Sequence, residues 1–296
     1  MDIKKVVYLG NRVASYKVLY TNPQYSIIKT LTFKDSALQR FLNNENQSYE
    51  LISELDRDYV IHILINLSFD MLVVNGCPFI LPASHLKSQG KVLLNTHPSY
   101  LPYLRGKRPI NGTLLYNYPL GATTHFISDE IDGGNIIYQE KVELTPDLDM
   151  GLCYHISFSL EETVFKKALE VLEKNPSYVG EEIDTKKYPL FNNNASLRML
   201  DFENMSSDIC AQCIRAYGVS NEGCYGIIAG ERYIIYDAED IVNEYILEKY
   251  SNVESGQVAL LYDSKMLVKC FSGLLKVKKY EKFYNQPALC KMTLYN

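Results

Sequence analysis

The sequence predicts an α/β protein with a Rossmann-like, mainly parallel sheet in its amino-terminal part and a smaller, mostly antiparallel β domain after it. Three observations carry this prediction. Apolar runs in the first hundred residues end at Gly or Asn, as buried parallel strands do. A long stretch in the middle has helical periodicity, and short strand-like runs separated by Gly and Asp follow it. We place a boundary near residue 190, which gives domains over residues 1–190 and 191–296.

Composition is typical of a globular protein of a reducing compartment. The 296 residues are 47% hydrophobic, and the formal charge of −5 argues against a surface built to bind nucleic acid. The seven cysteines do not suggest a disulfide framework. Cys210 and Cys213 have zinc or redox spacing but no second pair nearby, so we interpret them as core thiols and expect no metal. The first apolar run is too short for a signal peptide, and polar residues interrupt the longest one, at residues 59–82. We therefore expect a soluble, cytoplasmic protein without a membrane partner.

Strand and helix patterns alternate in the amino-terminal part. A β-branched run at residues 4–10 predicts a first strand, and the second part of residues 35–58 looks helical. A buried strand follows at residues 71–74, then a short helix at 83–90 and a third strand at 91–95. This alternation favours a parallel sheet covered by helices.

The following segments complete the first domain. Residues 108–119 suggest a helix that ends at Pro119, and residues 121–144 alternate like a hairpin with a turn at Asp132-Gly133-Gly134. Residues 147–175 have apolar side chains three or four apart, so we expect a long helix that covers one face of the sheet. Residues 176–194 are polar and contain Pro and Gly, which is typical of a linker.

Short elements predict the second domain. A helix is expected at residues 207–216, followed by strand-like runs at 224–230, 232–241, 257–262, 266–270 and 274–281. Short strands separated by turn residues are typical of a small antiparallel β unit.

Two polar side chains stand at the end of the third predicted strand. Asn95 and His97 are two residues apart and therefore share one face, at the carboxyl end where parallel α/β sheets bind ligands. An imidazole there can relay a proton, and an amide can donate to an oxygen that gains negative charge. The following turn offers a carboxylate that could orient the imidazole, from Asp129, Glu130 or Asp132. On its own, an Asn-x-His pair at a strand end is more often a capping or core polar pair than a catalytic one, and Asp-Gly-Gly is more often just a turn.

The segments that carry these residues resemble the two signatures of the 10-formyltetrahydrofolate-dependent formyltransferases. The signature Asn-x-His-x-Ser-x-x-Pro-x-x-Arg-Gly is matched by Asn95, His97, Ser99, Pro102, Arg105 and Gly106. The second signature, Gly-x-Thr-x-His with an Asp-x-Gly turn, is matched by Gly121, Thr123, His125, Asp132 and Gly134. The resemblance extends from about residue 71 to about residue 235. Tyr100 replaces the usual Leu, and the usual Pro-x-Phe is missing after Gly10, so these departures concern the acceptor pocket.

The resemblance implies an N-formyltransferase that uses 10-formyltetrahydrofolate as cosubstrate and needs no metal. It assigns Asn95, His97 and Asp132 as the catalytic triad. It also implies that main-chain groups of two segments hold the pterin, and these segments include Phe79, Ile80, Leu81, Asp129 and Ile131. Ordinary core packing at a strand end explains the first of these segments equally well.

The acceptor could be initiator methionyl-tRNA, which the family includes among its substrates. A tRNA enzyme should have a basic carboxyl-terminal domain. Residues 191–296 instead carry 11 Lys and Arg against 13 Asp and Glu. A local cluster is formed by Lys276, Lys278, Lys279 and Lys282, and it fits the solvated face of an edge strand equally well. The charge balance weakens the tRNA hypothesis.

A nucleotide-linked amino sugar fits the sequence better as acceptor. An enzyme for glycinamide ribonucleotide would leave the last part of the chain unexplained. In a sugar enzyme, Arg105, Lys107 and Arg108 would lie near a diphosphate, although Lys107 fits an exposed loop better. We therefore predict a dTDP- or UDP-linked 3- or 4-amino sugar, used for bacterial surface polysaccharides such as the O-antigen of lipopolysaccharide. Sugar enzymes of this family commonly pair, so we also expect a homodimer.

Other classes remain as rivals. A hydrolase could release formate from the same folate with the same three side chains, and a non-catalytic binding module could share the scaffold. A nicotinamide-dependent oxidoreductase is disfavoured because residues 8–17 lack the G-x-G-x-x-G loop.

Overall fold

The computed structural model describes residues 3–87 and 89–283, which form two compact units. The first unit comprises residues 1–110, 119–144 and 154–191, and the second takes residues 111–118, 145–153 and 192–296. Two segments from within the predicted first domain thus belong to the second unit. The assignment of functional domains to residues 1–190 and 191–296 stays a prediction. Cys290 and the rest of residues 284–296 lie outside the described residues.

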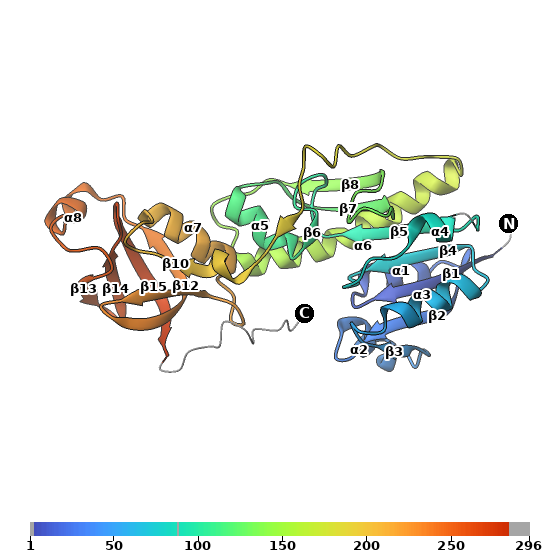
Figure 1. Ribbon diagram of the computed structural model, residues 1–296, viewed down its shortest axis with the longest axis horizontal. Helices are drawn as coiled ribbons and strands as arrows, with labels where there is room; N and C mark the ends of the chain where they lie inside the picture. Colours follow the sequence, from blue (N-terminus) through green and yellow to red (C-terminus); the bar gives the residue numbers. More distant parts are fainter. Residues whose placement is uncertain (1–2, 88, 284–296) are drawn as a thin grey trace. The chain divides into compact units, whose positions relative to one another are not determined.

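A seven-stranded sheet organises the first unit, in the order β3-β2-β1-β4-β5-β7-β8 (Figure 1). The strands from β3 to β5 are parallel, and β7 and β8 are antiparallel to their neighbours. Their bounds are β1 Lys4–Gly10, β2 Tyr25–Phe33, β3 Glu50–Ile52, β4 Met71–Asn75, β5 Val92–His97, β7 Leu120–Phe126 and β8 Ile136–Val142. The predicted α/β fold with a mainly parallel sheet is confirmed.

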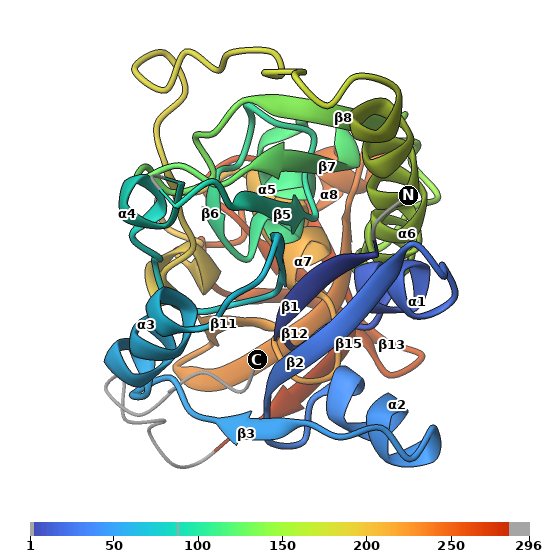
Figure 2. The ribbon, with the colours of Figure 1, turned by 90° about the vertical axis from the view of Figure 1, so that its right-hand side faces the viewer.

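Helices cover both faces of this sheet (Figure 2). One apolar core packs α1 (Ala14–Tyr20), α2 (Ala37–Asn44) and α6 (Met150–Lys174) against it, and a second core packs α3 (Arg57–Asn66) and α4 (Ala83–Lys87) against the other face. Neighbouring residues of β1 divide between the two cores, with Val6 and Tyr8 in the first and Val7 and Leu9 in the second. Burial on both faces explains why this strand is apolar throughout.

The helix predicted in the second part of residues 35–58 is wrong in position. Helix α2 occupies the first part, where the Ser36 hydroxyl accepts from the Gln39 N–H at 3.0 Å and caps it. Asn46 then adopts a positive φ of 52°, and the following residues form β3 beside β2. The sequence interpretation also missed α1, β2 and α3. The long helix predicted over residues 147–175 is confirmed as α6.

The second unit contains a six-stranded sheet in the order β10-β11-β12-β15-β14-β13. All its pairings are antiparallel except β10 with β11, so the predicted mostly antiparallel β domain is confirmed. The elements in and around it are η1 Ala195–Arg198, β10 Met199–Leu200, α7 Ser207–Tyr217, β11 Cys224–Ile228, β12 Glu231–Asp240, α8 Glu244–Lys249, β13 Val258–Tyr262, β14 Lys265–Lys269 and β15 Leu274–Lys282. The lysine-rich β15 lies between β12 and β14, which corrects its interpretation as an edge strand.

Three short elements complete the description. Helix α5 spans Pro109–Tyr116, and β6 and β9 are two-residue strands at Gly106–Lys107 and Phe191–Asn192.

Candidate active site

Strand β5 carries Asn95 and His97 to the carboxyl edge of the first sheet. Leu93, two residues earlier, packs in the core with α3 and α4, and Asn95 and His97 extend from the same face beyond it. The antiparallel β7 places His125 directly opposite Asn95. Two histidines and an amide therefore meet where the parallel strands end.

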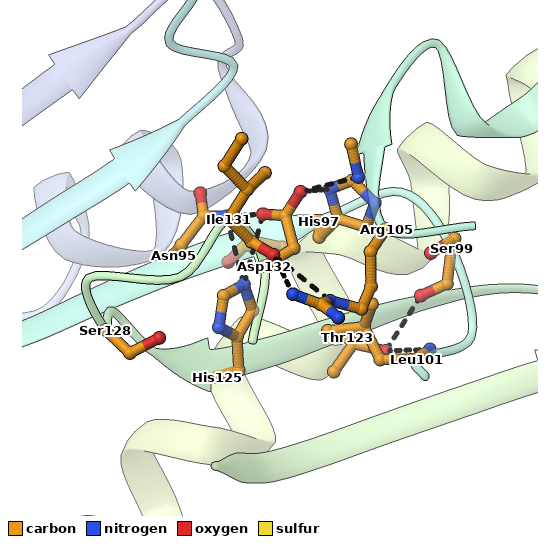
Figure 3. A network of polar contacts seen from close by, with 12 residues as sticks. Asn95, His97, Ser99, Leu101, Arg105, Thr123, His125, Ser128, Ile131 and Asp132 are labelled. Carbon is orange, nitrogen blue, oxygen red and sulfur yellow. Dashed lines mark hydrogen bonds and ion pairs between the residues drawn. The ribbon is translucent and has the colours of Figure 1, made fainter. Parts of the chain in front are cut away.

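Asp132 comes from the turn that joins β7 to β8. It adopts a positive φ of 44°, which few residues other than Gly tolerate. At Gly134, a Cβ atom would lie 1.7 Å from the main-chain oxygen of Phe126, so the turn folds tightly against the end of β7. This fold directs the Asp132 carboxylate toward Asn95 and His97 (Figure 3).

The Asn95 amide has both its N–H groups engaged. Its Nδ2 donates to Asp132 Oδ1 at 3.1 Å and lies 3.0 Å from His125 Nε2. His125 Nδ1 lies 2.8 Å from the Phe126 carbonyl, which fixes its proton on Nδ1 and leaves Nε2 to accept. Oδ1 of Asn95 has no protein partner among the described residues and is not a buried atom. The amide therefore presents an acceptor, not a donor, to the open side.

His97 faces an oxygen atom with each ring nitrogen. Its Nε2 is 3.1 Å from the Leu104 carbonyl, and its Nδ1 is 3.5 Å from Asp132 Oδ2. Burial lowers the pKa of His97 from its ordinary value of 6.5, and Asp132 and the Leu104 carbonyl only partly oppose this shift. The ring is thus neutral near pH 7, while its protonated form has an acceptor ready on both sides.

Asp132 is a carboxylate that stays ionised despite its burial. Burial alone would raise its pKa, but the neighbouring His97 and His125 rings and the N–H of Gly106 hold the pKa well below its ordinary value. Gly106 donates to Oδ2 at 2.9 Å, and His125 Nε2 lies 3.6 Å from Oδ1. A permanent negative charge therefore stands beside His97.

The residues predicted to hold the pterin lie on two loops of the first unit. Phe79, Ile80 and Leu81 follow the end of β4, and Ile80 is 47% exposed while Leu81 is buried. Asp129 and Ile131 lie in the turn after β7. The Asp129 carboxylate accepts from the Ser84 N–H of α4 at 3.1 Å, which ties this turn to the helix that follows the first loop.

Arg105 is buried, and its guanidinium is committed to main-chain oxygens. Nε and Nη2 donate to Ile131 at 3.1 and 2.8 Å, and Nη1 donates to Thr185 and Tyr188 at 3.2 and 3.0 Å. The side chain is 5% exposed. Its predicted contact with a diphosphate does not fit this arrangement, because the N–H groups that would bind phosphate already hold the turn and residues 185–188.

The other two predicted diphosphate contacts differ from Arg105. Lys107 is exposed on β6, and Arg108 is half-buried with a positive φ of 53°.

His125 is the member of the cluster to which sequence reasoning gave no role. It belongs to the second signature, yet its contact with Asn95 depends on the antiparallel pairing of β5 and β7. The alternation of residues 121–144 predicted a hairpin, but nothing in it indicated that β7 would pair with β5.

Two features are absent from residues 3–87 and 89–283. These residues contain no group of three or more His, Cys, Asp or Glu side chains placed to hold a metal ion. They also include no helix that is long and apolar enough to cross a membrane.

The family model for "Formyl transferase" matches residues 18–169, which is more than half of the chain. A methionyl-tRNA formyltransferase from Syntrophus aciditrophicus is 26% identical over 217 residues, covering 72% of this chain and 66% of the relative. Formyltetrahydrofolate deformylase 2 from Arabidopsis thaliana is 29% identical over 136 residues, covering 45% of this chain and 42% of that protein. The chain thus spans less than two thirds of the length of these curated relatives.

A solved structure resembles nearly the whole chain. The sugar 3N-formyl transferase WlaRD, solved in the presence of dTDP and 5-N-formyl-THF, matches with a TM-score of 0.69. The match has 17% sequence identity and covers 97% of this chain and all of that one. At this identity, the likeness shows a shared fold.

Proposed function

The chain belongs to the formyl transferase family, and we propose that it transfers a formyl group from 10-formyltetrahydrofolate to the amine of a nucleotide-linked amino sugar. We assign Asn95, His97 and Asp132 as its catalytic triad. The observation that carries this assignment is the contact of an ionised carboxylate, a neutral imidazole and an amide at the open edge of the sheet. In such a site, proton transfer and orientation of the amine are available together.

His97 moves the proton in the proposed reaction. The acceptor amine attacks the formyl carbon, a C–N bond forms, and the carbonyl oxygen becomes an oxyanion. His97 takes the proton from the attacking nitrogen at Nδ1, because Nε2 already donates to Leu104. It then returns this proton to N10 as the C–N10 bond breaks, which releases tetrahydrofolate. Asp132 stabilises the intervening imidazolium.

Asn95 orients the amine and supports the oxyanion. Its Oδ1 is placed to accept an N–H of the attacking amine. Its own N–H groups are bonded to His125 and Asp132, so donation to the oxyanion requires that one of these bonds be released. The bond to Asp132 is the candidate, because this carboxylate gains a stronger partner when His97 becomes protonated.

The folate is proposed to bind between the two loops at the carboxyl ends of β4 and β7. The residues concerned are Phe79, Ile80, Leu81, Asp129 and Ile131. The bond between Asp129 and Ser84 supports this proposal because it fixes the spacing between the turn and α4. The exposed Ile80 adds apolar surface beside the main-chain groups.

A nucleotide-linked amino sugar is favoured over tRNA by the pairing of the β15 lysines. Lys276 forms an ion pair with Glu239, Lys278 lies 3.0 Å from Asp237, and Lys282 lies 3.1 Å from Glu231. The neighbouring carboxylates offset the positive charge of these three lysines and so weaken the attraction of this strand for the phosphates of a nucleic acid. A sugar 3N-formyl transferase also shares the fold over 97% of the chain.

The test is a panel of acceptors incubated with 10-formyltetrahydrofolate. We expect mass spectrometry to find one added formyl group on a dTDP- or UDP-linked 3- or 4-amino sugar. The panel includes methionyl-tRNA, and a reaction without any amine measures formate release. Activity on the charged tRNA alone, or formate release that no amine suppresses, would contradict the proposed acceptor. Formate release that no amine suppresses would identify a hydrolase. The similarity to formyltetrahydrofolate deformylase 2 is the reason for including this test.

Three further proposals accompany this function. We propose a homodimer, which sedimentation analysis tests, a cytoplasmic location, and a role in bacterial surface polysaccharide synthesis such as that of O-antigen.

A further inference from the structure

Arg12 stands at the same edge of the sheet as the proposed triad and has no role in the mechanism above. It follows β1, which runs parallel to β4 and, through β4, to β5, so its loop lies at the carboxyl end of the sheet. Its side chain is 25% exposed. Within residues 3–87 and 89–283, its Nη1 bonds to Glu161, while no acceptor engages its Nε or Nη2. The guanidinium therefore keeps donors available on its outer side.

The position of this guanidinium is fixed from two sides. Nη1 forms an ion pair with Oε1 of Glu161, and the guanidinium carbon lies 4.5 Å over the ring of Phe158. Both partners belong to α6. The Arg12 side chain is thus already held through Nη1 and through one face of its guanidinium plane. It therefore loses little conformational entropy when its remaining N–H groups bind a ligand.

The partner of Arg12 is unusual because it is a fully buried carboxylate. Burial raises the pKa of Glu161, and the charge of Arg12 opposes this shift. Its Oε2 has no hydrogen-bond partner among the described residues, and neither has the buried Oδ1 of Asn75. A buried ion pair adds little to the stability of a fold. The role that remains for Glu161 is to orient the Arg12 guanidinium.

We propose that Arg12, held by Glu161 and Phe158, binds a phosphate group of the acceptor. This inference rests on the proposed function, since a nucleotide-linked sugar carries a diphosphate between its base and the reacting sugar. A planar guanidinium with free N–H groups matches phosphate oxygens in bidentate geometry. Arg105, the predicted contact, forms four hydrogen bonds to main-chain oxygens, and its Nη2 also lies 3.6 Å from the Glu130 carboxylate.

The electrostatics of the edge support this assignment. Arg12 is one of the charges that lower the pKa of His97, so the two groups lie within each other's field. A phosphate on Arg12 would lie at the same edge of the sheet as His97, because β4 alone separates β1 from β5.

Binding of phosphate-containing probes tests the inference without turnover. Titration calorimetry on the full chain uses inorganic pyrophosphate, dTDP and UDP, with thymidine and uridine as phosphate-free counterparts. We expect Arg12→Gln to weaken binding of pyrophosphate and of both diphosphates about 10- to 100-fold, the range for losing a charge-assisted hydrogen bond. Arg12→Lys should recover part of this loss, and nucleoside binding should stay unchanged.

Two controls keep the result interpretable. Arg12→Gln leaves Glu161 unpaired, so the double variant Arg12→Gln/Glu161→Gln removes both charges, and retained 5-formyltetrahydrofolate binding reports its fold. Arg40→Gln removes an arginine of α2 whose Nη1 donates to the Asp35 carbonyl, and it should bind pyrophosphate normally. Unchanged pyrophosphate binding in a folded double variant, or an equal loss in Arg40→Gln, would overturn the inference.

The test also separates this inference from the proposed acceptor. If the double variant loses pyrophosphate and no amino sugar is formylated, the phosphate contact stands and the sugar assignment fails. Displacement of pyrophosphate by dTDP would identify a nucleotide as the source of the phosphate. Displacement by tRNA alone would support the same contact with a nucleic acid.

Discussion

At the scale of single residues, Asn95 allows the most direct test of the proposed chemistry. Replacing it with Ala removes the acceptor for the amine and the donor for the oxyanion, while the surrounding β5 remains. We expect Asn95→Ala to reduce kcat by roughly 10²- to 10³-fold, the usual effect of losing one oxyanion donor. Steady-state kinetics measure this loss.

The matched control is Asn66→Ala at the end of α3, where the amide Nδ2 donates to the His62 carbonyl at 2.8 Å. This variant should retain full activity. Equal turnover by Asn95→Ala and the unchanged protein would remove Asn95 from the mechanism.

A second residue-scale prediction concerns pH. His97 has to be neutral to accept a proton, so activity should fall as pH drops through its pKa. Because burial lowers this pKa, we expect the acid limb of kcat/KM to lie below the ordinary histidine value of 6.5. Asp132 opposes the shift, so Asp132→Asn should move the limb to still lower pH as well as slow the reaction. A limb that moves to higher pH in Asp132→Asn would contradict the assignment.

At the scale of elements, the turn between β7 and β8 positions Asp132. A Cβ atom on residue 134 would meet the Phe126 carbonyl at 1.7 Å, and main-chain atoms cannot yield cheaply. We expect Gly134→Ala to displace the turn and lower kcat by about 100-fold, as a displacement of about 1 Å in a catalytic group does. It should also destabilise the fold by about 1–3 kcal/mol, measured by urea unfolding.

Gly151→Ala provides the control for this change. Gly151 lies in the first turn of α6, and its nearest contact is a side-chain oxygen of Asp149 at 3.3 Å. Helices favour Ala over Gly, so this variant should keep its activity and its stability. Gly134→Ala with normal kinetics would show that the turn tolerates movement.

The elements also show where sequence reasoning succeeds. Strands β1 and β4 were predictable because a strand buried on both faces must be apolar at every position. Strand β2 was missed because Lys29 and Thr30 interrupt its apolar run, and helix α2 was misplaced because its start depends on the Ser36 cap. Pairing between distant strands, such as β5 with β7, leaves no local pattern in the sequence.

In the candidate active site, too, local patterns were predictable from the sequence and long-range contacts were not. Asn95 and His97 were predictable as neighbours because side chains two apart share a strand face. The role of Arg105 was not predictable. Its partners are main-chain oxygens of residues 131, 185 and 188, and no pattern of side chains in the sequence indicates such contacts. The pairing of Arg12 with Glu161 was equally hidden, because helical periodicity assigns a face to residue 161 but no partner.

At the scale of the whole molecule, all the proposed catalytic and folate residues belong to the first unit. A ligand that binds only the native form stabilises the part of the chain that holds its site, by about 2.7 kcal/mol at a concentration of 100 Kd. We expect 5-formyltetrahydrofolate to raise the transition of the first unit in differential scanning calorimetry and to leave that of the second unchanged. The variant Asn95→Ala, which retains the folate loops, should show the same rise. If both transitions rise together, the two units unfold as one cooperative block, and if neither rises at saturating ligand, the folate does not bind between the loops after β4 and β7.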